Sequence, residues 1–220
     1  MRLIDHGTDW VLYKSDFIES YQREIIEDLN TAYENFKNVF VNVDSSLTRR
    51  QELTFGDLPQ ILQAKDHNFI ENEMNNSNSN LSGYSFYNVF ALTAPSPYFY
   101  EIQRQLKSLI RLSIGDATPA WYQCWMNFHR PDTVLDWHDH HWDYHGYISI
   151  DPKETVTKFR NGDDHYEIVN KPGQIYFGPG YREHKVFVNE DFKGPRITLG
   201  YDVTLRASIP DSQFSLIPLP

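Results

Sequence analysis

Hydrophobic positions in the first half of the chain recur at helical spacing. Over residues 14–37 the apolar side chains come mostly at steps of three and four, and Ser15 or Asp16 is placed to cap the start. A second amphipathic helix is predicted over 97–113, with a proline near its first turn. The intervening stretch 71–83 is rich in Asn and Ser, which predicts a polar surface loop.

After Ala120 the pattern changes to short runs of aromatic and β-branched residues separated by Gly, Pro and Asp-Pro. Eight such runs predict strands over 121–129, 134–140, 146–150, 154–159, 165–169, 174–178, 184–188 and 196–204. Many short strands at this spacing favour a jelly roll, and helices followed by strands favour an α+β fold with the helices packed on one sheet. We expect a single domain over 1–220, with a helical flank (1–120) and a jelly-roll core (121–204).

The composition of the chain limits the kinds of functional site that it can form. The 220 residues suit one domain, and the net charge of −10 argues against broad binding to nucleic acid or anionic lipid. Apolar residues make up 40% of the chain, which supplies a core and excludes a disordered protein. The single cysteine, Cys124, excludes an internal disulfide and a cysteine-only metal site. A metal site in this chain would have to use histidines and carboxylates.

The amino terminus is charged and lacks an apolar signal-peptide core, and no stretch reaches the roughly 20 apolar residues that span a bilayer. We therefore expect a cytoplasmic protein without a membrane partner.

Seven of the nine histidines lie between His129 and His184. On a strand over 134–140, His138 and His140 would point to one side and Asp139 to the other. Two imidazoles on one side can hold a metal ion if a third ligand comes from elsewhere, and His184 is the obvious candidate. Arg196 follows twelve residues later, with Thr198 on the same face of the last strand.

This order of motifs resembles the iron(II)- and 2-oxoglutarate-dependent oxygenases, and most closely their prolyl-hydroxylase-like branch with uncharacterised bacterial and phage members. The resemblance covers about residues 121–204 and rests on several motifs. They are Trp125-x-Asn127, Leu135-x-x-His138-x-His140, Gly173-x-Ile175-x-Phe177-x-Pro179, His184-x-Val186 and Arg196-x-Thr198.

The resemblance implies a double-stranded β-helix, the cupin-like form of the jelly roll, that binds Fe(II), 2-oxoglutarate and O2. The metal ligands would be His138, His140 and His184, and Arg196 would bind the far carboxylate of 2-oxoglutarate with Thr198 beside it. Trp125, Asn127 and His129, together with Gln123, share one face of their strand and could line the same pocket. The reaction would hydroxylate a substrate, such as a prolyl or other peptide side chain, with release of succinate and CO2.

One position departs from the family pattern, because the slot that normally holds Asp or Glu is His140. Three ligand sets stay open: the three histidines; a His141-x-Asp143 pair; or Asp139, brought in by a β-bulge. Three imidazoles would also accept zinc, cobalt, nickel or copper.

Two other functions compete with the oxygenase. One is a cupin-like three-histidine metalloenzyme that does not use 2-oxoglutarate. The other is a non-catalytic jelly-roll binding module whose histidines hold no catalytic iron.

Overall fold

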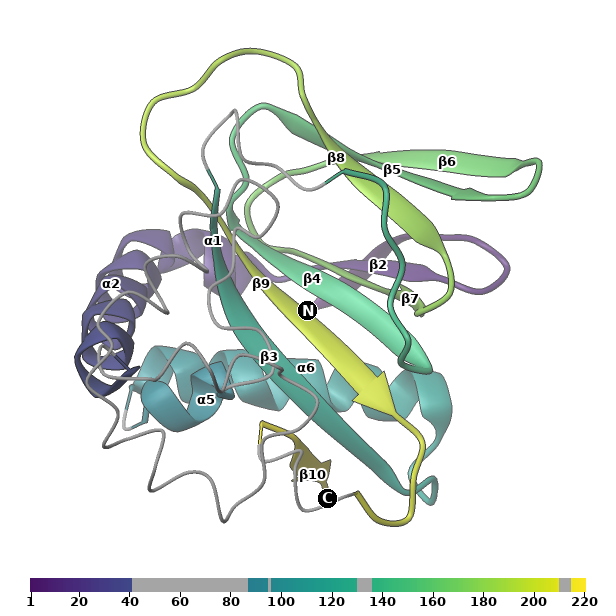
Figure 1. Ribbon diagram of the computed structural model, residues 1–220, viewed down its shortest axis with the longest axis horizontal. Coiled ribbons are helices and arrows are strands. Elements are labelled where there is room, and N and C mark those ends of the chain that lie inside the picture. The colour runs from purple at the N-terminus through teal and green to yellow at the C-terminus, as the bar shows by residue number, and fades with distance from the viewer. Residues whose placement is uncertain (41–86, 95, 130–135, 210–214) are drawn as a thin grey trace.

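A computed structural model of the chain describes residues 1–40, 87–94, 96–129, 136–209 and 215–220, with residues 34–40 described by their helical backbone only. Figure 1 shows two sheets, with helices against one face of the larger sheet. The larger sheet has seven strands in the order β1-β2-β7-β4-β9-β3-β10, and the smaller has three in the order β6-β5-β8. Every strand pairing in both sheets is antiparallel. This is the arrangement of a double-stranded β-helix, so the expected α+β fold is confirmed.

Along the chain β1–β4 belong to the large sheet and β5 and β6 to the small one, and then β7 and β9 return to the large sheet on either side of β8. Their bounds are β1 Arg2–His6, β2 Val11–Lys14, β3 Ala120–His129, β4 Tyr144–Asp151, β5 Thr155–Asn161, β6 Asp164–Val169, β7 Gln174–Pro179, β8 Glu183–Val188, β9 Arg196–Thr204 and β10 Ile217–Leu219. Seven of the eight predicted strands correspond to β3–β9. The expected strand over 134–140 is wrong in its described part, because residues 136–143 form no strand and only His138 makes an isolated bridge, to His184.

The helices follow the predicted apolar periodicity with one difference. The expected helix over 14–37 is divided into α1 (Asp16–Ser20) and α2 (Gln22–Phe40), and the Ser15 side chain caps α1 by accepting from the Ile18 amide. The second predicted helix is α6 (Pro97–Ile114), preceded by the short α5 (Val89–Leu92). Ser96 caps α6, so the proline occupies the first turn, where its missing N–H costs nothing. The expected loop over 71–83 lies outside the described residues.

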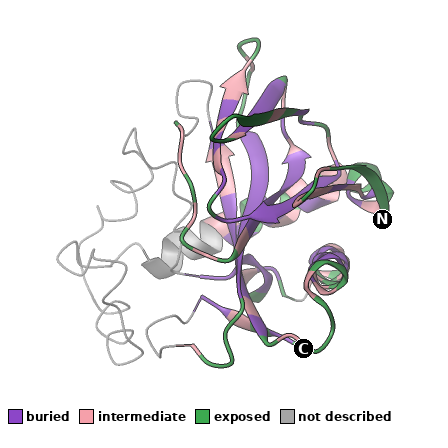
Figure 2. Cartoon of the chain, turned by 90° about the vertical axis from the view of Figure 1, so that its right-hand side faces the viewer, coloured by how far each residue is buried: buried purple, intermediate pink, exposed green. Residues whose placement is uncertain are grey.

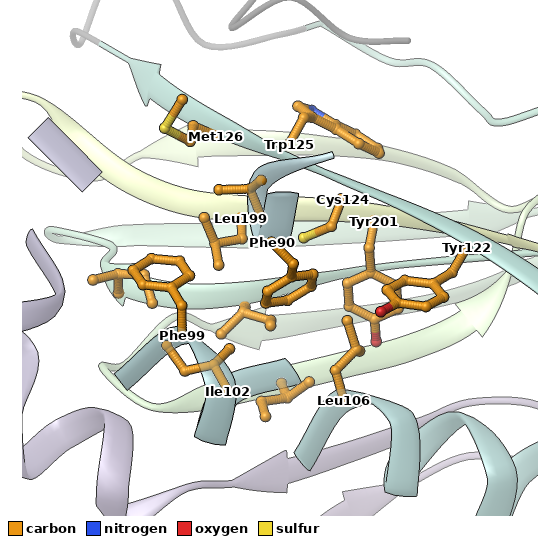
Figure 3. Packing of buried hydrophobic residues seen from close by; sticks show 14 of the residues in the cluster. Phe90, Phe99, Ile102, Leu106, Tyr122, Cys124, Trp125, Met126, Leu199 and Tyr201 are labelled. Atoms are coloured by element: carbon orange, nitrogen blue, oxygen red, sulfur yellow. The ribbon is translucent and has the colours of Figure 1, made fainter. Parts of the chain in front are cut away.

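The main core lies between the helices and the seven-stranded sheet. Figure 3 shows the rings and aliphatic side chains of α5 and α6 packed against those of β3 and β9. On β9 the helix-facing residues are Ile197, Leu199, Tyr201 and Val203, all nearly or fully buried. Because side chains alternate along a strand, the intervening β9 residues must face the smaller sheet.

The space between the two sheets is also buried but is much more polar. Figure 2 shows most strand residues of the large sheet as buried. A second, small apolar cluster lies here, formed by Leu12, Tyr147, Phe159, Ile168 and Tyr176. Most of the remaining inward positions of β3, β4 and β9 carry Gln, Asn, His, Ser, Thr, Arg and Asp side chains. This polar interior is where the candidate site lies.

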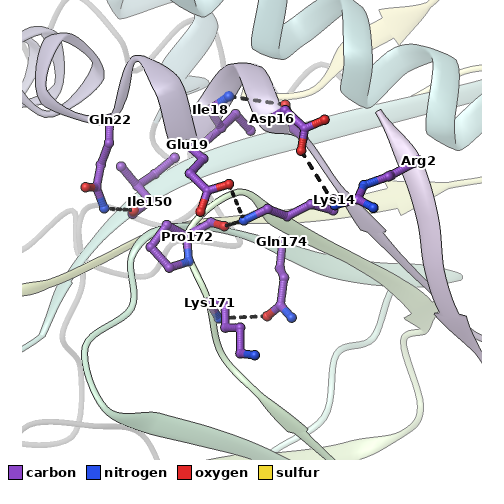
Figure 4. Close-up of polar contacts among 11 residues, drawn as sticks. Arg2, Lys14, Asp16, Ile18, Glu19, Gln22, Ile150, Lys171, Pro172 and Gln174 are labelled. Atoms are coloured by element: carbon purple, nitrogen blue, oxygen red, sulfur yellow. Dashed lines mark hydrogen bonds and ion pairs between the residues drawn. The ribbon is translucent and has the colours of Figure 1, made fainter.

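The amino-terminal segment adds β1 and β2 to the edge of the large sheet, and the sequence pattern did not predict either strand. Figure 4 shows how the start of the helical region is tied to the sheet: Lys14 reaches the Pro172 carbonyl and pairs with Glu19 at 2.8 Å. Gln22 donates to the Ile150 carbonyl at 2.6 Å. These contacts fix the helices to β4 directly and, through Lys14 of β2, to the turn before β7.

No helix in the described ranges is long and apolar enough to cross a membrane.

Candidate functional site

Tertiary hydrogen bonds hold the histidine-rich segment 136–143 against the start of β8. The His138 amide donates to the His184 carbonyl at 3.1 Å, and the His184 amide returns a bond of 2.8 Å. The His140 amide donates to the Gly180 carbonyl at 2.8 Å. A Cβ on Gly180 would lie 1.9 Å from the Trp142 carbonyl oxygen, so only glycine permits this approach. The segment therefore runs like a short strand beside β8, although it forms no ladder.

This pairing brings the three predicted histidines together. The ring centroids of His138 and His184 are 4.2 Å apart, those of His140 and His184 are 5.3 Å apart, and those of His138 and His140 are 5.5 Å apart. One ligand atom from each of the three lies within 4.8 Å of the others. The spacing suits convergence on a single ion.

In all three histidines the Nδ1 atom lies close to an oxygen atom. His138 Nδ1 is 2.7 Å from the Asp136 carbonyl oxygen, and His184 Nδ1 is 3.3 Å from the Arg182 carbonyl oxygen. His140 Nδ1 is 2.7 Å from Oδ1 of Asp202. When Nδ1 carries the proton toward an oxygen, Nε2 keeps its lone pair, which is how metal-binding histidines are generally oriented.

Burial disfavours the charged form of two of these rings, His138 and His184. Desolvation lowers the pKa of His138, and the nearby charge of His140 lowers it further. The pKa of His184 is lowered well below its usual value by desolvation and by His138 and His140. Metal ligands must be deprotonated, so neutral imidazoles with free Nε2 atoms fit a divalent transition metal.

A fourth histidine, His145 on β4, lies against the same group. It is 2% exposed, and its ring centroid is 4.2 Å from that of His184 and 4.5 Å from that of His140. Its pKa is lowered well below the usual value by desolvation, then by the neighbouring histidines. With His140 and Asp202 it forms a second group whose ligand atoms lie within 4.8 Å of one another.

The inner faces of β3, β4 and β9 form rungs that lead away from the histidines. In register, Gln123, Asp202 and His145 share one rung, Asn127, Thr198 and Ser149 share another, and His129 faces Arg196 at the end. This continuity places the histidines and Arg196 in one polar interior.

Trp125 lies between the histidines and Arg196, opposite Gly200 on β9. A Cβ on Gly200 would lie 2.5 Å from Cζ2 of the indole, so the glycine makes room for the ring. The Trp125 ring is 6.1 Å from that of His140, and its Nε1 donates to Asn127 at 3.1 Å. Asn127 in turn donates to the Thr198 hydroxyl at 3.4 Å.

Arg196 is 3% exposed and makes only long contacts with neutral groups. Its guanidinium lies 3.3 Å from the Thr155 hydroxyl and 3.4 Å from both the Thr198 hydroxyl and His129 Nδ1. Desolvation lowers the pKa of Arg196 to about 10, so the group remains a cation at neutral pH. Within the described part of the chain, no carboxylate pairs with it. A buried cation of this kind is costly unless an anion joins it.

No protein-family model matches the sequence, and no curated protein matches it. Solved structures do resemble it. One is an oxidoreductase of the 2OG-Fe(II) oxygenase family from Burkholderia pseudomallei, at 13% identity and a TM-score of 0.42, covering 50% of this chain and 59% of that one. Another is a prolyl-4-hydroxylase from Pseudomonas putida, at 10% identity and a TM-score of 0.42, covering 52% of this chain and 70% of that one.

Both solved structures are distant from this chain in sequence, and the likeness concerns the fold alone. The chain matches less than two thirds of the Burkholderia protein.

The other candidate ligands lie elsewhere. Asp139, His141 and Asp143 are exposed. The Asp143 carboxylate accepts from the Thr204 hydroxyl at 3.1 Å and from the Leu205 amide at 2.8 Å, at the end of β9. The ligand groups found in the described ranges contain none of these three residues.

Sequence reasoning did not single out Tyr147, Ser149 and Asp202, which share the polar interior. Tyr147 Oη is buried beside Thr157, and Ser149 Oγ is buried with no hydrogen-bond partner among the described residues. Asp202 is fully buried and contacts His140. The alternation of side chains along a strand could have identified them. Tyr147 and Ser149 lie two and four residues after His145, and Asp202 lies four residues after Thr198, so each falls on the same strand face as a predicted or neighbouring site residue.

Proposed function

We propose that the protein is an Fe(II)- and 2-oxoglutarate-dependent dioxygenase that hydroxylates its substrate. The observation that carries this proposal is the combination, in one polar interior, of three histidines with converging ligand atoms and a buried arginine that pairs with no carboxylate among the described residues. The histidines suit a metal, and the arginine suits the far end of a dicarboxylate.

The buried positive charge of Arg196 indicates that the co-substrate carries a carboxylate. A guanidinium pairs with a carboxylate in a bidentate, charge-assisted fashion, and the desolvated surroundings strengthen such a pair. Hydroxyls of Thr198 and Thr155 already lie within 3.4 Å of the guanidinium and could donate to the same carboxylate. The buried hydroxyls of Tyr147 and Ser149 face the same interior. Together they form a site for an anion with several oxygen acceptors.

His138, His140 and His184 would hold the metal through Nε2. When bound, Fe(II) would supply the chemistry that couples oxidative decarboxylation of 2-oxoglutarate to hydroxylation. The side chains around it shield the centre from water: His184 is buried against Phe159, and Trp125 covers the side toward Asn127. We propose a prolyl or other peptide side chain, or a small molecule, as the substrate.

A direct test is anaerobic titration of the Fe(II)-loaded protein with 2-oxoglutarate, followed by a succinate assay in air. We expect saturable binding of 2-oxoglutarate that depends on metal, and slow succinate formation even without substrate. Absence of both would overturn the proposal.

The all-nitrogen ligand set also favours a second candidate, a three-histidine metalloenzyme that binds its substrate directly to the metal. The variant Arg196→Ala distinguishes these two candidate functions. In the proposed oxygenase this variant binds 2-oxoglutarate much more weakly, whereas in the alternative it leaves turnover independent of 2-oxoglutarate intact. A protein that binds no stoichiometric metal would instead be the non-catalytic module.

A further inference from the structure

The position where the family pattern has a carboxylate ligand is His140, yet a buried carboxylate lies directly behind this residue. We infer that Asp202 orients His140 and supplies the negative charge that the ligand set lacks, acting through the imidazole rather than as a metal ligand. This inference rests on the proposed function, because it assumes that His138, His140 and His184 hold the ion.

The contact pattern distinguishes His140 from its two partners. Nδ1 of His138 and Nδ1 of His184 lie near backbone carbonyl oxygens, whereas Nδ1 of His140 lies 2.7 Å from a side-chain carboxylate. A carboxylate that accepts the Nδ1 proton makes Nε2 a more basic ligand and fixes the ring orientation. His140 is thus the imidazole with ligand properties closest to those of a charged group.

Asp202 is held in place from the opposite side. Its Oδ2 accepts from Gln123 Nε2 at 2.8 Å, and Gln123 Oε1 accepts from the Ser215 hydroxyl at 3.0 Å. Asp202, Gln123 and Ser215 are all 3% exposed or less. This chain links β9, β3 and the segment before β10, so the position of the carboxylate is set by the sheet rather than by the histidine loop.

Charge explains why such a residue is needed. Three neutral imidazoles around a divalent ion leave two positive charges in a buried site, one more than a set with a carboxylate ligand. A buried ion is tolerated when a counter-charge lies nearby. Asp202, one imidazole away, provides that counter-charge.

The inference predicts that Asp202→Asn weakens metal affinity without abolishing it. We expect a loss of roughly 10–100-fold in affinity for Co(II), the usual cost of removing an outer partner of a metal ligand. Affinity is measured by titration against a competing chelator, and circular dichroism of the metal-free protein checks the fold. Glu167→Gln, which removes an exposed carboxylate from β6, is the charge-matched control and should leave the affinity unchanged.

A double-mutant cycle separates a charge role from a structural one. His140→Asp places a second carboxylate beside Asp202, whereas in the Asp202→Asn background it restores a single one. We therefore expect His140→Asp to raise the Co(II) affinity of the Asp202→Asn variant. In the wild-type background the same substitution should raise the affinity less, or lower it. Purely additive effects would overturn the inference.

Other results have equally definite meanings. If Asp202→Asn does not fold, Gln123→Ala replaces it. This variant keeps the charge of Asp202 but loosens the position of its carboxylate, and an unchanged Co(II) affinity would overturn the inference.

If His145→Ala and Asp202→Asn both lose the metal while His138→Ala keeps it, then Asp202 is itself a ligand and the inference is wrong. If His138→Ala and His184→Ala bind Co(II) like the wild type, the proposed function fails as well.

Discussion

The two faces of the seven-stranded sheet use the same strands for opposite purposes. On β9, the residues Ile197, Leu199, Tyr201 and Val203 face the helices, and all are buried apolar or aromatic groups. The alternate residues Arg196, Thr198, Asp202 and Thr204 face the smaller sheet and are just as buried, yet they are polar or charged. Burial without apolar character does not stabilise a fold by itself. The difference indicates that the helix face holds the protein together and that the inner face is built for a ligand.

If this division is correct, substitutions on the inner face change ligand binding with little loss of stability, and substitutions on the helix face do the reverse. Four experiments test it, beginning with the largest effect.

His184→Ala on the inner face should abolish stoichiometric metal binding. The expected loss of affinity exceeds the roughly 10–100-fold that follows removal of an outer partner, because a ligand itself is removed. Metal content of protein purified without an affinity tag measures this. The control is His165→Ala, an exposed histidine on β6 of the same small sheet, which should keep the metal. A full complement of metal in His184→Ala would show that the ion lies elsewhere.

Leu199→Ala on the helix face should lower the free energy of unfolding by about 2–5 kcal/mol, because it leaves a cavity in the main core. Leu199 is fully buried, and the matched control Leu112→Ala on α6 removes a side chain that is 72% exposed. Urea unfolding of the metal-free proteins measures both variants. Metal affinity of the folded fraction should not change; a large loss of affinity with normal stability would contradict the division between the faces.

Arg196→Ala should weaken 2-oxoglutarate binding by about 2–5 kcal/mol, the usual cost of truncating one partner of a buried charge pair. The metal-free protein should be no less stable than the wild type, since an uncompensated buried cation has been removed. Calorimetric titration in the presence of Mn(II) and urea unfolding give the two values. Arg206→Ala, an exposed arginine beyond β9, serves as the control. Strong destabilisation with unchanged 2-oxoglutarate binding would assign Arg196 to the fold instead.

The smallest effect is a pH dependence of the metal-free protein. Burial lowers the pKa of His145 and of His184 in the folded state, so below the usual value of about 6.5 the unfolded chain binds more protons than the folded one. Stability should therefore fall as the pH drops from about 6.5, by up to about 1.4 kcal/mol per pH unit for each such histidine, until the lowered folded-state pKa is reached.

His145→Phe should reduce this acid sensitivity, because it removes one buried titrating group, whereas His165→Ala should not. Urea unfolding at a series of pH values checks both. A stability that rises on acidification through this range would contradict the sign of the lowered pKa values.

Much of this architecture could be predicted because strands β3–β9 carry their signal locally. Runs such as Ile197–Val203 alternate apolar and polar side chains, and turns with Gly and Pro mark their ends. The starts of α1 and α6 were visible in the same way, from Ser15 or Asp16 as a cap and from Pro97 in the first turn.

The segment 136–143 was harder because tertiary contacts determine its conformation. Its aromatic and histidine content favours a strand, but the segment is held by one reciprocal pair of bonds between His138 and His184 and by a bond from His140 to Gly180, rather than by a ladder. His138 and His140 still meet His184, so the expected grouping of the side chains holds although the expected strand does not.

The role of Asp202 could not be predicted from sequence for a different reason. A carboxylate at an alternate position of a strand normally points to solvent, and its burial here depends on the second sheet and on Gln123, 79 residues away. Tyr147 and Ser149 were missed for the same reason, because only the packing of the two sheets makes their face an interior.

The most direct test of the central claim is calorimetric binding of 2-oxoglutarate to the wild type and to Arg196→Ala, each saturated with Mn(II) under anaerobic conditions. The account predicts one site per chain in the wild type, no binding when the metal is removed, and a loss of roughly 30-fold or more in Arg196→Ala. Equal binding by both proteins, or no binding by the metal-loaded wild type, would contradict it.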